Sequence, residues 1–237
     1  MNARTQHGFS LIELAIVLVI IGLLVGGGIA ALSATTEQTN RAAERQQLRY
    51  VREALYGFAM STGRLPCADS DSPPDGKENY DSGTNACESG ANRGALPWVT
   101  LGLARRDAWG NPLRYRVDAS YADAPAAGTS SSFALDAGAA LDVYDAAGGS
   151  LVADDVPAVV VSYGPQGGQV WTSTGFTCPG SGAGFSADEQ ENCDDDGNFV
   201  ATGYRGTATA NGRFDDMLTW TSGPVLKARM VDAGRLP

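Results

Sequence analysis

The sequence predicts an α+β protein in which one long N-terminal helix packs on an antiparallel β-sheet head held by two disulfides. Three observations predict this fold. An almost entirely apolar run covers residues 9–32, an amphipathic pattern follows it to about residue 61, and the remainder consists of short apolar runs separated by Gly, Asp, Ser and Pro. Helical periodicity followed by short, separated runs is typical of a helix joined to a loop-rich β domain. With 237 residues, of which 43 % are hydrophobic, the chain can bury a core.

The apolar run over residues 9–32 is predicted to cross a membrane. As a helix it would measure about 36 Å at ~1.5 Å per residue, and the hydrocarbon core of a bilayer is about 30 Å thick. Glu13 is the only charged residue in this run. A carboxylate inside a membrane helix costs roughly 2.5–3.5 kcal/mol, so Glu13 is a candidate functional residue. A secretory signal peptide would have a charge-free apolar region instead.

The residues before this run complete a recognisable signal. Residues 1–8 are polar and end in Gly8, and Phe9-Ser10-Leu11-Ile12-Glu13 follows. This pattern resembles the class III signal of type IV prepilins and type II secretion pseudopilins. The resemblance implies that prepilin peptidase cuts between Gly8 and Phe9 and methylates Phe9. It also implies a role in assembly for Glu13, whose carboxylate would be neutralised in a filament by an α-amino group, because a buried charge without a partner is strongly unfavourable. The alternatives are an ordinary signal peptide with a poor cleavage site at residues 31–33, and an uncleaved anchor.

The helix is expected over residues 9–62, with its transmembrane half at about 9–32. Three consecutive glycines at 26–28 cost about 1 kcal/mol each relative to Ala, and they indicate either a weak point or a close helix contact through small residues. An apolar stripe then recurs at spacings of three and four residues; its members are Leu48, Val51, Leu55 and Phe58. Gly63 and Pro66 are expected to end the helix. The predicted division is therefore a leader at 1–8, the helix at 9–62 and a head at 63–237.

The four cysteines are expected to form two local disulfides. Cys67, Cys87, Cys178 and Cys193 include no Cys-x-x-Cys pair and have no histidine nearby, so a zinc site is not expected. Four cysteines allow three connectivities. The sequence-local pairs, Cys67–Cys87 and Cys178–Cys193, would each close an irregular loop of roughly 15–20 residues and contribute on the order of 3 kcal/mol. Disulfides indicate an oxidising compartment.

The head is expected to begin its sheet after a turn at residues 107–112. The run Asp-x-Trp-Gly-Asn-Pro resembles the start of the β region in the major pseudopilin of type II secretion. Asp107 can cap this turn, and apolar residues alternate with Arg114 and Arg116 beyond it, as in a half-buried strand. Further strands are expected at residues 141–144, 150–152, 158–163, 169–173 and 214–220, with 158–163 central, followed by a short helix from Ser222 to about residue 232 and by Gly234 as its terminator.

Charge and composition argue against several functions. The net charge of −10 repels phosphate backbones, so nucleic acid is not an expected partner. The local basic residues are expected on a solvated face; they are Arg105, Arg106, Arg114 and Arg116. The only histidine, His7, lies in the leader, so neither a Ser-His-Asp nor a Cys-His arrangement can form in the mature chain, and an enzyme is not expected.

Calcium is the one ligand that the sequence suggests. Residues 189–198 are rich in side-chain oxygens, and Asp215 follows them at a distance. The resemblance adds that major pseudopilins bind calcium in a C-terminal loop of this character, ahead of a Trp that Trp220 resembles. The candidate ligands are Asp194, Asp196, Asn198 and Asp215. The first three match only the start of an EF-hand, because Phe199 and Arg205 stand where Gly and Glu are needed, so a solvated acidic loop is the alternative.

Taken together, these features predict a structural subunit, a pilin or pseudopilin. The head is longer than that of the usual major pseudopilin, which favours a minor or specialised subunit. The expected partners are other subunits of the filament, prepilin peptidase and an inner-membrane assembly platform. The expected location is the inner membrane, with one pass and a periplasmic head, and then a periplasmic or cell-surface filament. The alternative is a membrane-anchored periplasmic binding module that shares only the signal.

Overall fold

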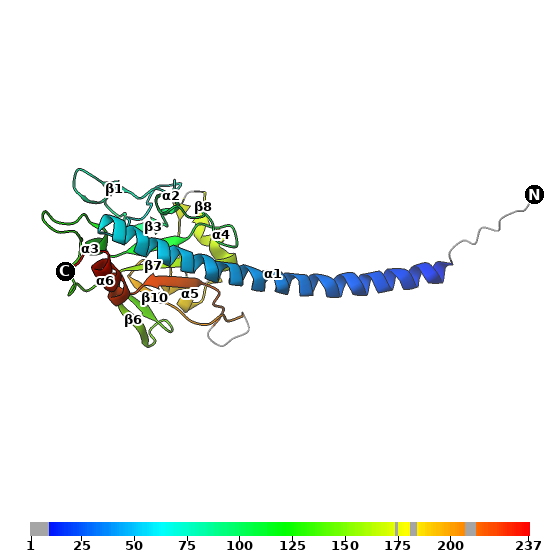
Figure 1. The fold of residues 1–237 in the computed structure, drawn as a ribbon. Helices are drawn as coiled ribbons and strands as arrows, with labels where there is room; N and C mark the ends of the chain where they lie inside the picture. The colour runs from blue at the N-terminus through cyan, green and yellow to red at the C-terminus, as the bar shows by residue number, and fades with distance from the viewer. Residues whose placement is uncertain (1–9, 174, 181–183, 207–211) are drawn as a thin grey trace, which may run out of the picture. The chain divides into compact units, whose positions relative to one another are not determined.

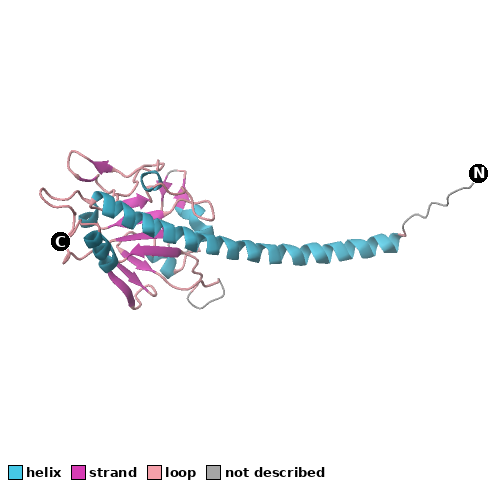
Figure 2. Ribbon diagram, in the orientation of Figure 1, coloured by secondary structure: helices cyan, strands magenta, loops and turns pink. Residues whose placement is uncertain are grey.

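The computed structural model describes residues 10–173, 175–180, 184–206 and 212–237, without the side chains of 24–34. The chain divides into two compact units, residues 1–42 and 43–237, and every strand of the described residues lies in the second unit (Figure 2). The elements are, in chain order (Figure 1), α1 (Leu11–Thr62), β1 (Tyr80–Asp81), β2 (Ala86–Cys87), β3 (Arg93–Ala95), α2 (Trp98–Leu101), β4 (Arg114–Val117), α3 (Ala119–Ala122), β5 (Leu141–Tyr144), β6 (Leu151–Val156), β7 (Ala158–Ser162), η1 (Gly164–Gln166), α4 (Gly167–Val170), β8 (Trp171–Thr172), β9 (Gly175–Phe176), α5 (Ala187–Glu191), β10 (Asn198–Val200), β11 (Met217–Thr221) and α6 (Gly223–Asp232).

The long helix expected from the sequence is present as α1. It ends where the sequence predicts, because Gly63 adopts a φ of 84° and donates its N–H to the carbonyl of Ala59 at 2.8 Å. A left-handed residue after the last turn is the usual way to close a helix, and Gly adopts that conformation without strain.

The transmembrane half expected over residues 9–32 is not found. Within the part of the chain that the structure describes, no helix is both long enough and apolar enough to cross a membrane. Phe9 and the side chains of 24–34 lie outside the described residues.

A four-stranded antiparallel sheet forms the centre of the second unit, in the order β11-β7-β4-β3. All five residues of β7 are buried, and β7 lies between β11 and β4 as the continuous apolar run predicts. In the register of this sheet Val160 pairs with Tyr115 on one side and with Thr219 on the other. Because neighbouring residues of a strand face opposite sides, each strand supplies two different cores.

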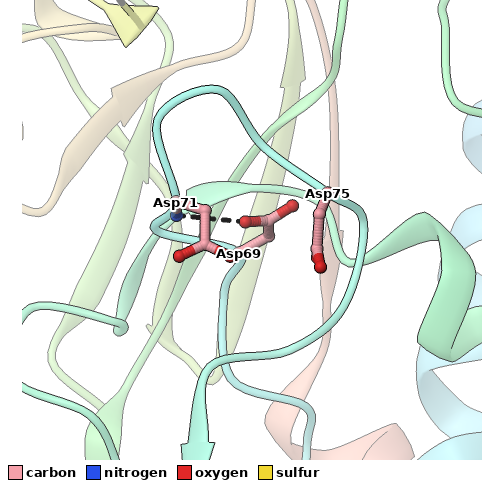
Figure 3. A group of neighbouring side chains, drawn as sticks. All are labelled: Asp69, Asp71 and Asp75. Atoms are coloured by element: carbon pink, nitrogen blue, oxygen red, sulfur yellow. Dashed lines mark hydrogen bonds between the residues drawn. The ribbon is translucent and has the colours of Figure 1, made fainter.

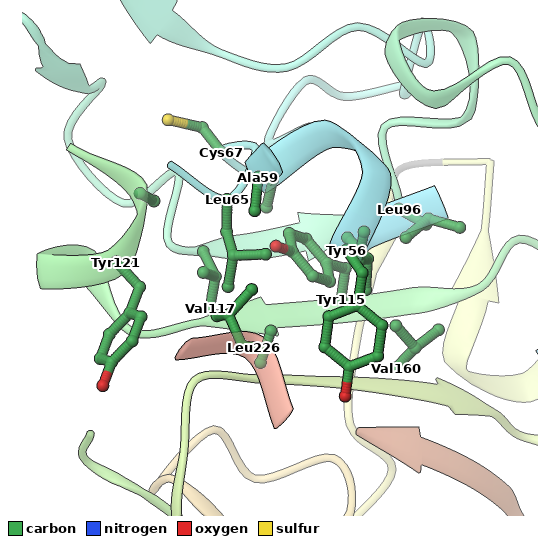
Figure 4. Close-up of a cluster of buried hydrophobic side chains, with 14 of the residues drawn as sticks. Tyr56, Ala59, Leu65, Cys67, Leu96, Tyr115, Val117, Tyr121, Val160 and Leu226 are labelled. Atoms are coloured by element: carbon green, nitrogen blue, oxygen red, sulfur yellow. The ribbon is translucent and has the colours of Figure 1, made fainter. Parts of the chain in front are cut away.

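One face of this sheet packs against two helices. The stripe of α1 that includes Leu48 and Leu55 is buried there, and so are Leu226 and Met230 of α6. Figure 4 shows Tyr115, Val117 and Val160 of the sheet beside side chains of both helices. The amphipathic half of the helix thus covers the sheet from residue 43 onward.

The other face packs against a second sheet. Val159 and Val161 of β7 share a core with Leu141 and Val143 of β5, and β5 lies in a three-stranded sheet of order β10-β5-β6. The expectation of a wholly antiparallel head is wrong at one place, because β10 pairs with β5 in parallel. The chain from β6 to α5 lies between these two strands in sequence, and a connection of that length lets β10 return in the direction of β5.

Several smaller elements differ from expectation, and the strands expected at 150–152 and 214–220 are observed at Leu151–Val156 and Met217–Thr221. Residues 167–170 form α4, so the strand expected at 169–173 is limited to β8. Ser222 precedes α6, but its side chain makes no capping hydrogen bond, and its N–H donates to the hydroxyl of Tyr56 at 3.0 Å. Gly234 follows the helix with a φ of 67°, as the sequence predicts.

Both disulfides join the cysteines that the local pairing predicts, Cys67 to Cys87 and Cys178 to Cys193. The first ties the segment after α1 to β2, and Cys67 is fully buried. The second ties the loop after β9 to the end of α5.

Candidate functional site

The first turn of α1 holds the residues of the N-terminal signal that the structure describes. The N–H of Ser10 donates to Oε2 of Glu13 at 2.9 Å, and the N–H of Glu13 donates to Oγ of Ser10 at 3.3 Å. This reciprocal pair is a capping box, which satisfies two N–H groups at a helix start. Gly8 and Phe9, where cleavage and methylation are expected, lie outside the described residues. Glu13 therefore has a local structural role in addition to the assembly role expected from the resemblance.

The four candidate calcium ligands are not brought together. Asp194 and Asp196 accept N–H groups two residues ahead, from Asp196 at 3.3 Å and from Asn198 at 2.8 Å, so this turn closes on itself. Asp215 instead lies with Glu189 and Asp216. Among the described residues the structure groups Asp215 with Glu189 and Asp216 and not with the turn, so the four-residue site stays a prediction.

The acidic turn at residues 194–198 binds an arginine of the central sheet. Asp195, which has a φ of 67°, accepts two hydrogen bonds from Nη2 of Arg114 at 2.6 and 2.8 Å. Arg114 is buried, and Arg116 is half-buried. The expectation that both lie on a solvated face is wrong, because β4 is an inner strand and the acidic turn covers its polar side.

Three buried carboxyl groups lie close together, one from α5 and two from the segment before β11. Glu189, Asp215 and Asp216 each place one oxygen within 4.8 Å of the others. The guanidinium of Arg213 pairs with Oδ2 of Asp215, and Nδ2 of Asn192 donates to Oδ2 of Asp216 at 2.9 Å. Both oxygens of Glu189 accept backbone N–H groups, from Ser186 at 2.9 Å and from Asp215 at 3.2 Å. Oδ1 of Asp215 and Oδ1 of Asp216 are buried without a hydrogen-bond partner. Burial raises the pKa of Glu189 and raises that of Asp216 well above its ordinary value.

The two unpartnered oxygens could act as ligands of a divalent cation of the calcium type, which would compete with the guanidinium of Arg213 for Asp215. Calcium takes six to eight oxygen ligands, including carboxylates that bind through one or both oxygens. Two buried oxygens without partners would otherwise carry the desolvation cost of unsatisfied polar atoms, about 1–3 kcal/mol each and more when charged. Glu189 and Asp216 were not among the candidate ligands, although Asp216 directly follows Asp215 in the sequence.

A second acidic group, Asp69, Asp71 and Asp75, has a different explanation (Figure 3). Asp69 is buried, and its two oxygens accept the N–H groups of Asp71 at 3.1 Å and Gly76 at 2.5 Å. Asp71 and Asp75 are exposed or nearly so. Asp69 therefore shapes the loop between α1 and β1, and its oxygens are already satisfied.

The N-terminal residues match a known family model. The model of the prokaryotic N-terminal methylation motif matches residues 3–29. The chain carries a class III prepilin signal. Comparison with curated proteins and with solved structures finds no significant match to the chain.

The two residues of the capping box are also residues of the prepilin signal. Ser10 and Glu13 belong to the matched residues, so the side chains that start α1 are also part of the signal. Replacement of Glu13 by Ala would change both the helix start and the charge, so the two effects need separate variants.

Glu44 is a buried carboxyl group outside the site residues expected from the sequence. It belongs to α1, is fully buried, and accepts the N–H of Ala108 through Oε2 at 2.9 Å. Its Oε1 has no partner. One turn further along, Nε2 of Gln47 donates to the carbonyl of Arg106 at 2.9 Å. These two side chains hold the turn at residues 106–108 against the helix.

The same turn is fixed from inside by Asp107. Its Oδ1 accepts the N–H groups of Trp109 at 3.0 Å and Asn111 at 2.8 Å, and its Oδ2 accepts the hydroxyl of Ser162 at 2.8 Å. The capping role expected for Asp107 is confirmed. Burial raises the pKa of Glu44 to about 7, and the nearby Asp107 carboxylate adds to this shift.

We expect Glu44 to make the head less stable as the pH rises. The pKa of Glu44 is about 7 in the folded chain, whereas the ordinary pKa of a Glu side chain is 4.5. Between these two pH values the folded state binds more protons than the unfolded state, so the folded state loses stability as the pH rises through this range. The loss is on the order of 3 kcal/mol between pH 4.5 and 8. Urea unfolding of wild type and Glu44→Gln at pH 5 and pH 8 measures it, and Glu44→Gln should remove most of the difference. The exposed Glu88, changed to Gln, is the control, and an unchanged pH dependence in Glu44→Gln would contradict the assignment.

Proposed function

We propose that this protein is a structural subunit of the pilin or pseudopilin type. One observation carries the proposal, the methylation motif at residues 3–29 with Glu13 at its place in the prepilin signal. The leader at 1–8 would be removed by prepilin peptidase and Phe9 methylated. The apolar residues that follow would anchor the chain in the inner membrane and then pack against other subunits, with the head in the periplasm or at the cell surface.

The head supports this proposal. Two disulfides suit an oxidising compartment. The stripe of α1 from Leu48 onward is buried on the sheet, while every described side chain over residues 10–23 is exposed, which leaves an apolar helix surface for a membrane or for neighbouring subunits. Exposed apolar surface of this extent marks an interaction site.

Mass spectrometry of the protein from its native membrane tests the processing step. We expect a mature chain that begins at Phe9 and carries one added methyl group at its N-terminus. Gly8→Ala, which changes the residue before the cut, is expected to leave the leader attached. A mature chain that begins at Met1 or near Ser33 would overturn the proposal in favour of an uncleaved anchor or an ordinary signal peptide.

We further propose that the triad of Glu189, Asp215 and Asp216 binds calcium and stabilises the head. A ligand that binds only the folded state adds about 2.7 kcal/mol at a concentration a hundredfold above its Kd. Thermal unfolding of the full chain should therefore shift upward with millimolar calcium and downward with chelator. Asp215→Asn should abolish the shift.

A matched variant separates this triad from the acidic turn. Asp196→Asn changes the turn at 194–198 and leaves the triad intact, so its response to calcium should equal that of wild type. If the calcium response is lost in Asp196→Asn and kept in Asp215→Asn, the calcium site lies in the turn at 194–198 and not at the triad. The absence of any response in wild type would contradict calcium binding by the triad.

A further inference from the structure

A pocket of about 370 Å³ opens on the head between three segments of the chain. The loop at residues 69–72 forms one wall, the start of β4 and the edge strand β3 form the floor, and the β8–β9 hairpin forms the other wall. Asp71, Arg93 and Asp195 contribute charged groups, and Trp171 and Phe176 contribute aromatic rings.

The walls are held in place by backbone contacts. Asp69 and Ala95 exchange two hydrogen bonds, of 3.0 and 2.7 Å, so the loop is tied to the edge of β3. A β-carbon at Gly94 would overlap the carbonyl of Asp69, and one at Gly175 would lie 2.9 Å from Oγ of Ser72. Residues without side chains at these two positions let the segments approach closely, and the pocket is therefore pre-formed.

The charges of the pocket largely cancel. The buried Arg114 is bound by Asp195, and its guanidinium lies 3.7 Å from the ring centroid of Phe176. Arg93, with 49 % of its side chain exposed, lies 4.0 Å from the same carboxylate. The exposed Asp71 and the buried Asp69 also line the pocket. Carboxylates on the lining disfavour an anion, and guanidinium groups disfavour a metal ion.

Two aromatic rings give the pocket an apolar surface. The rings of Trp171 and Phe176 have centroids 5.3 Å apart and are inclined at 66°, so they form a corner. Both side chains are half-buried, and both line the pocket. The guanidinium of Arg114 covers one face of the Phe176 ring. A ligand with an apolar face can pack on the exposed part of the two rings while its polar edge faces the charged groups.

We propose that this pocket binds a neutral sugar. A sugar hydroxyl both donates and accepts hydrogen bonds, and it can therefore pair with a guanidinium and a neighbouring carboxylate at once. The carbon-bound hydrogens of a pyranose ring form an apolar face that fits the aromatic corner. The volume lies at the lower end of the range of about 300–1,000 Å³ typical of small-molecule sites, which suits a short oligosaccharide. The inference goes beyond the filament role and does not depend on it.

Isothermal titration calorimetry on the full chain, kept in a detergent without a sugar headgroup, tests the proposal. The probes are glucose, galactose, mannose, N-acetylglucosamine, lactose and cellobiose, with sodium acetate and glycine as charged comparisons. We expect saturable binding of at least one sugar and no comparable binding of acetate or glycine. Arg93→Ala removes an exposed side chain and should weaken that binding about tenfold, the usual effect of losing a charged hydrogen bond.

Two further variants fix the location. Trp171→Ala should also weaken sugar binding about tenfold or more, with its folding checked by thermal unfolding. Arg49→Ala, an exposed arginine on α1 that does not line the pocket, should bind as wild type. The proposal is overturned if none of the sugars binds, if acetate or glycine binds more tightly than any sugar, or if binding is unaffected by Arg93→Ala.

Discussion

Glu13→Gln is expected to yield a subunit that is cleaved and inserted but excluded from filaments. Gln keeps the size of the side chain and can still accept the N–H of Ser10, so the capping box survives. What is lost is the negative charge that would neutralise an α-amino group among apolar helices. Leaving one partner of a buried pair alone costs about 3–5 kcal/mol, a hundredfold or more in the assembly equilibrium. The measurement is the fraction of subunit in sheared filaments against membranes, in cells that lack the native copy.

Ser10→Ala is the matched control for this experiment. It removes the hydroxyl that accepts the N–H of Glu13 and leaves the carboxylate in place. The loss of a helix cap costs about 0.5–2 kcal/mol, so incorporation should fall only slightly. If Ser10→Ala abolishes incorporation while Glu13→Gln preserves it, Glu13 acts by capping the start of α1. The proposed pairing of its carboxylate with an α-amino group would then be refuted. Normal incorporation of both variants would leave Glu13 as a residue read only by the peptidase.

Removing the Cys67–Cys87 disulfide is expected to destabilise the head by about 2–5 kcal/mol. The bridge spans 20 residues of irregular chain, and its loss gives the unfolded chain more freedom. Cys67 is also fully buried within the core beneath α1, so the double variant Cys67→Ala, Cys87→Ala should lose packing as well. Urea unfolding under oxidising conditions measures the change in the free energy of unfolding.

The second disulfide provides the comparison. Cys178 and Cys193 are 15 residues apart, so the chain-entropy contribution is nearly the same, about 3 kcal/mol. Cys178 is half-buried, and replacement of both residues by Ala should cost less than loss of the first bridge and should expose the loop at 178–193 to protease. A cost below about 1 kcal/mol for both double variants would show that neither bridge constrains the chain.

Much of the fold follows from local patterns. The spacing of Leu48, Val51 and Leu55 predicts the buried stripe of α1, and Gly63 marks its end. The continuous apolar run at 158–163 predicts the inner strand β7, which covers Ala158–Ser162. The two disulfides are also predictable, because cysteines close in sequence within irregular loops meet at little entropic cost. These features depend on residues near one another in the chain.

The parallel pairing of β10 with β5 is a feature that the sequence did not reveal. Strand patterns show which residues are buried, but not which strand lies beside which or in what direction. Glu44 shows the same limit within a helix. It stands four residues before Leu48, in line with the apolar stripe, which is a signal that could have identified it as buried; its partner, Ala108, lies 64 residues away.

The sequence by itself determined the N-terminal signal, the long helix, the disulfide pairs and the central strand. Only the tertiary structure decided which charges meet. Arg114 and Asp195 are 81 residues apart, and Asp215 and Glu189 are 26 apart. A local pattern shows which side chains of an element face the core. Contacts between residues so far apart in sequence form only when the layers pack, and the polar groups of the opposite layer then decide which partner each buried charge has. The acidic turn therefore became the partner of an arginine, and the oxygen-rich site formed at Glu189, Asp215 and Asp216.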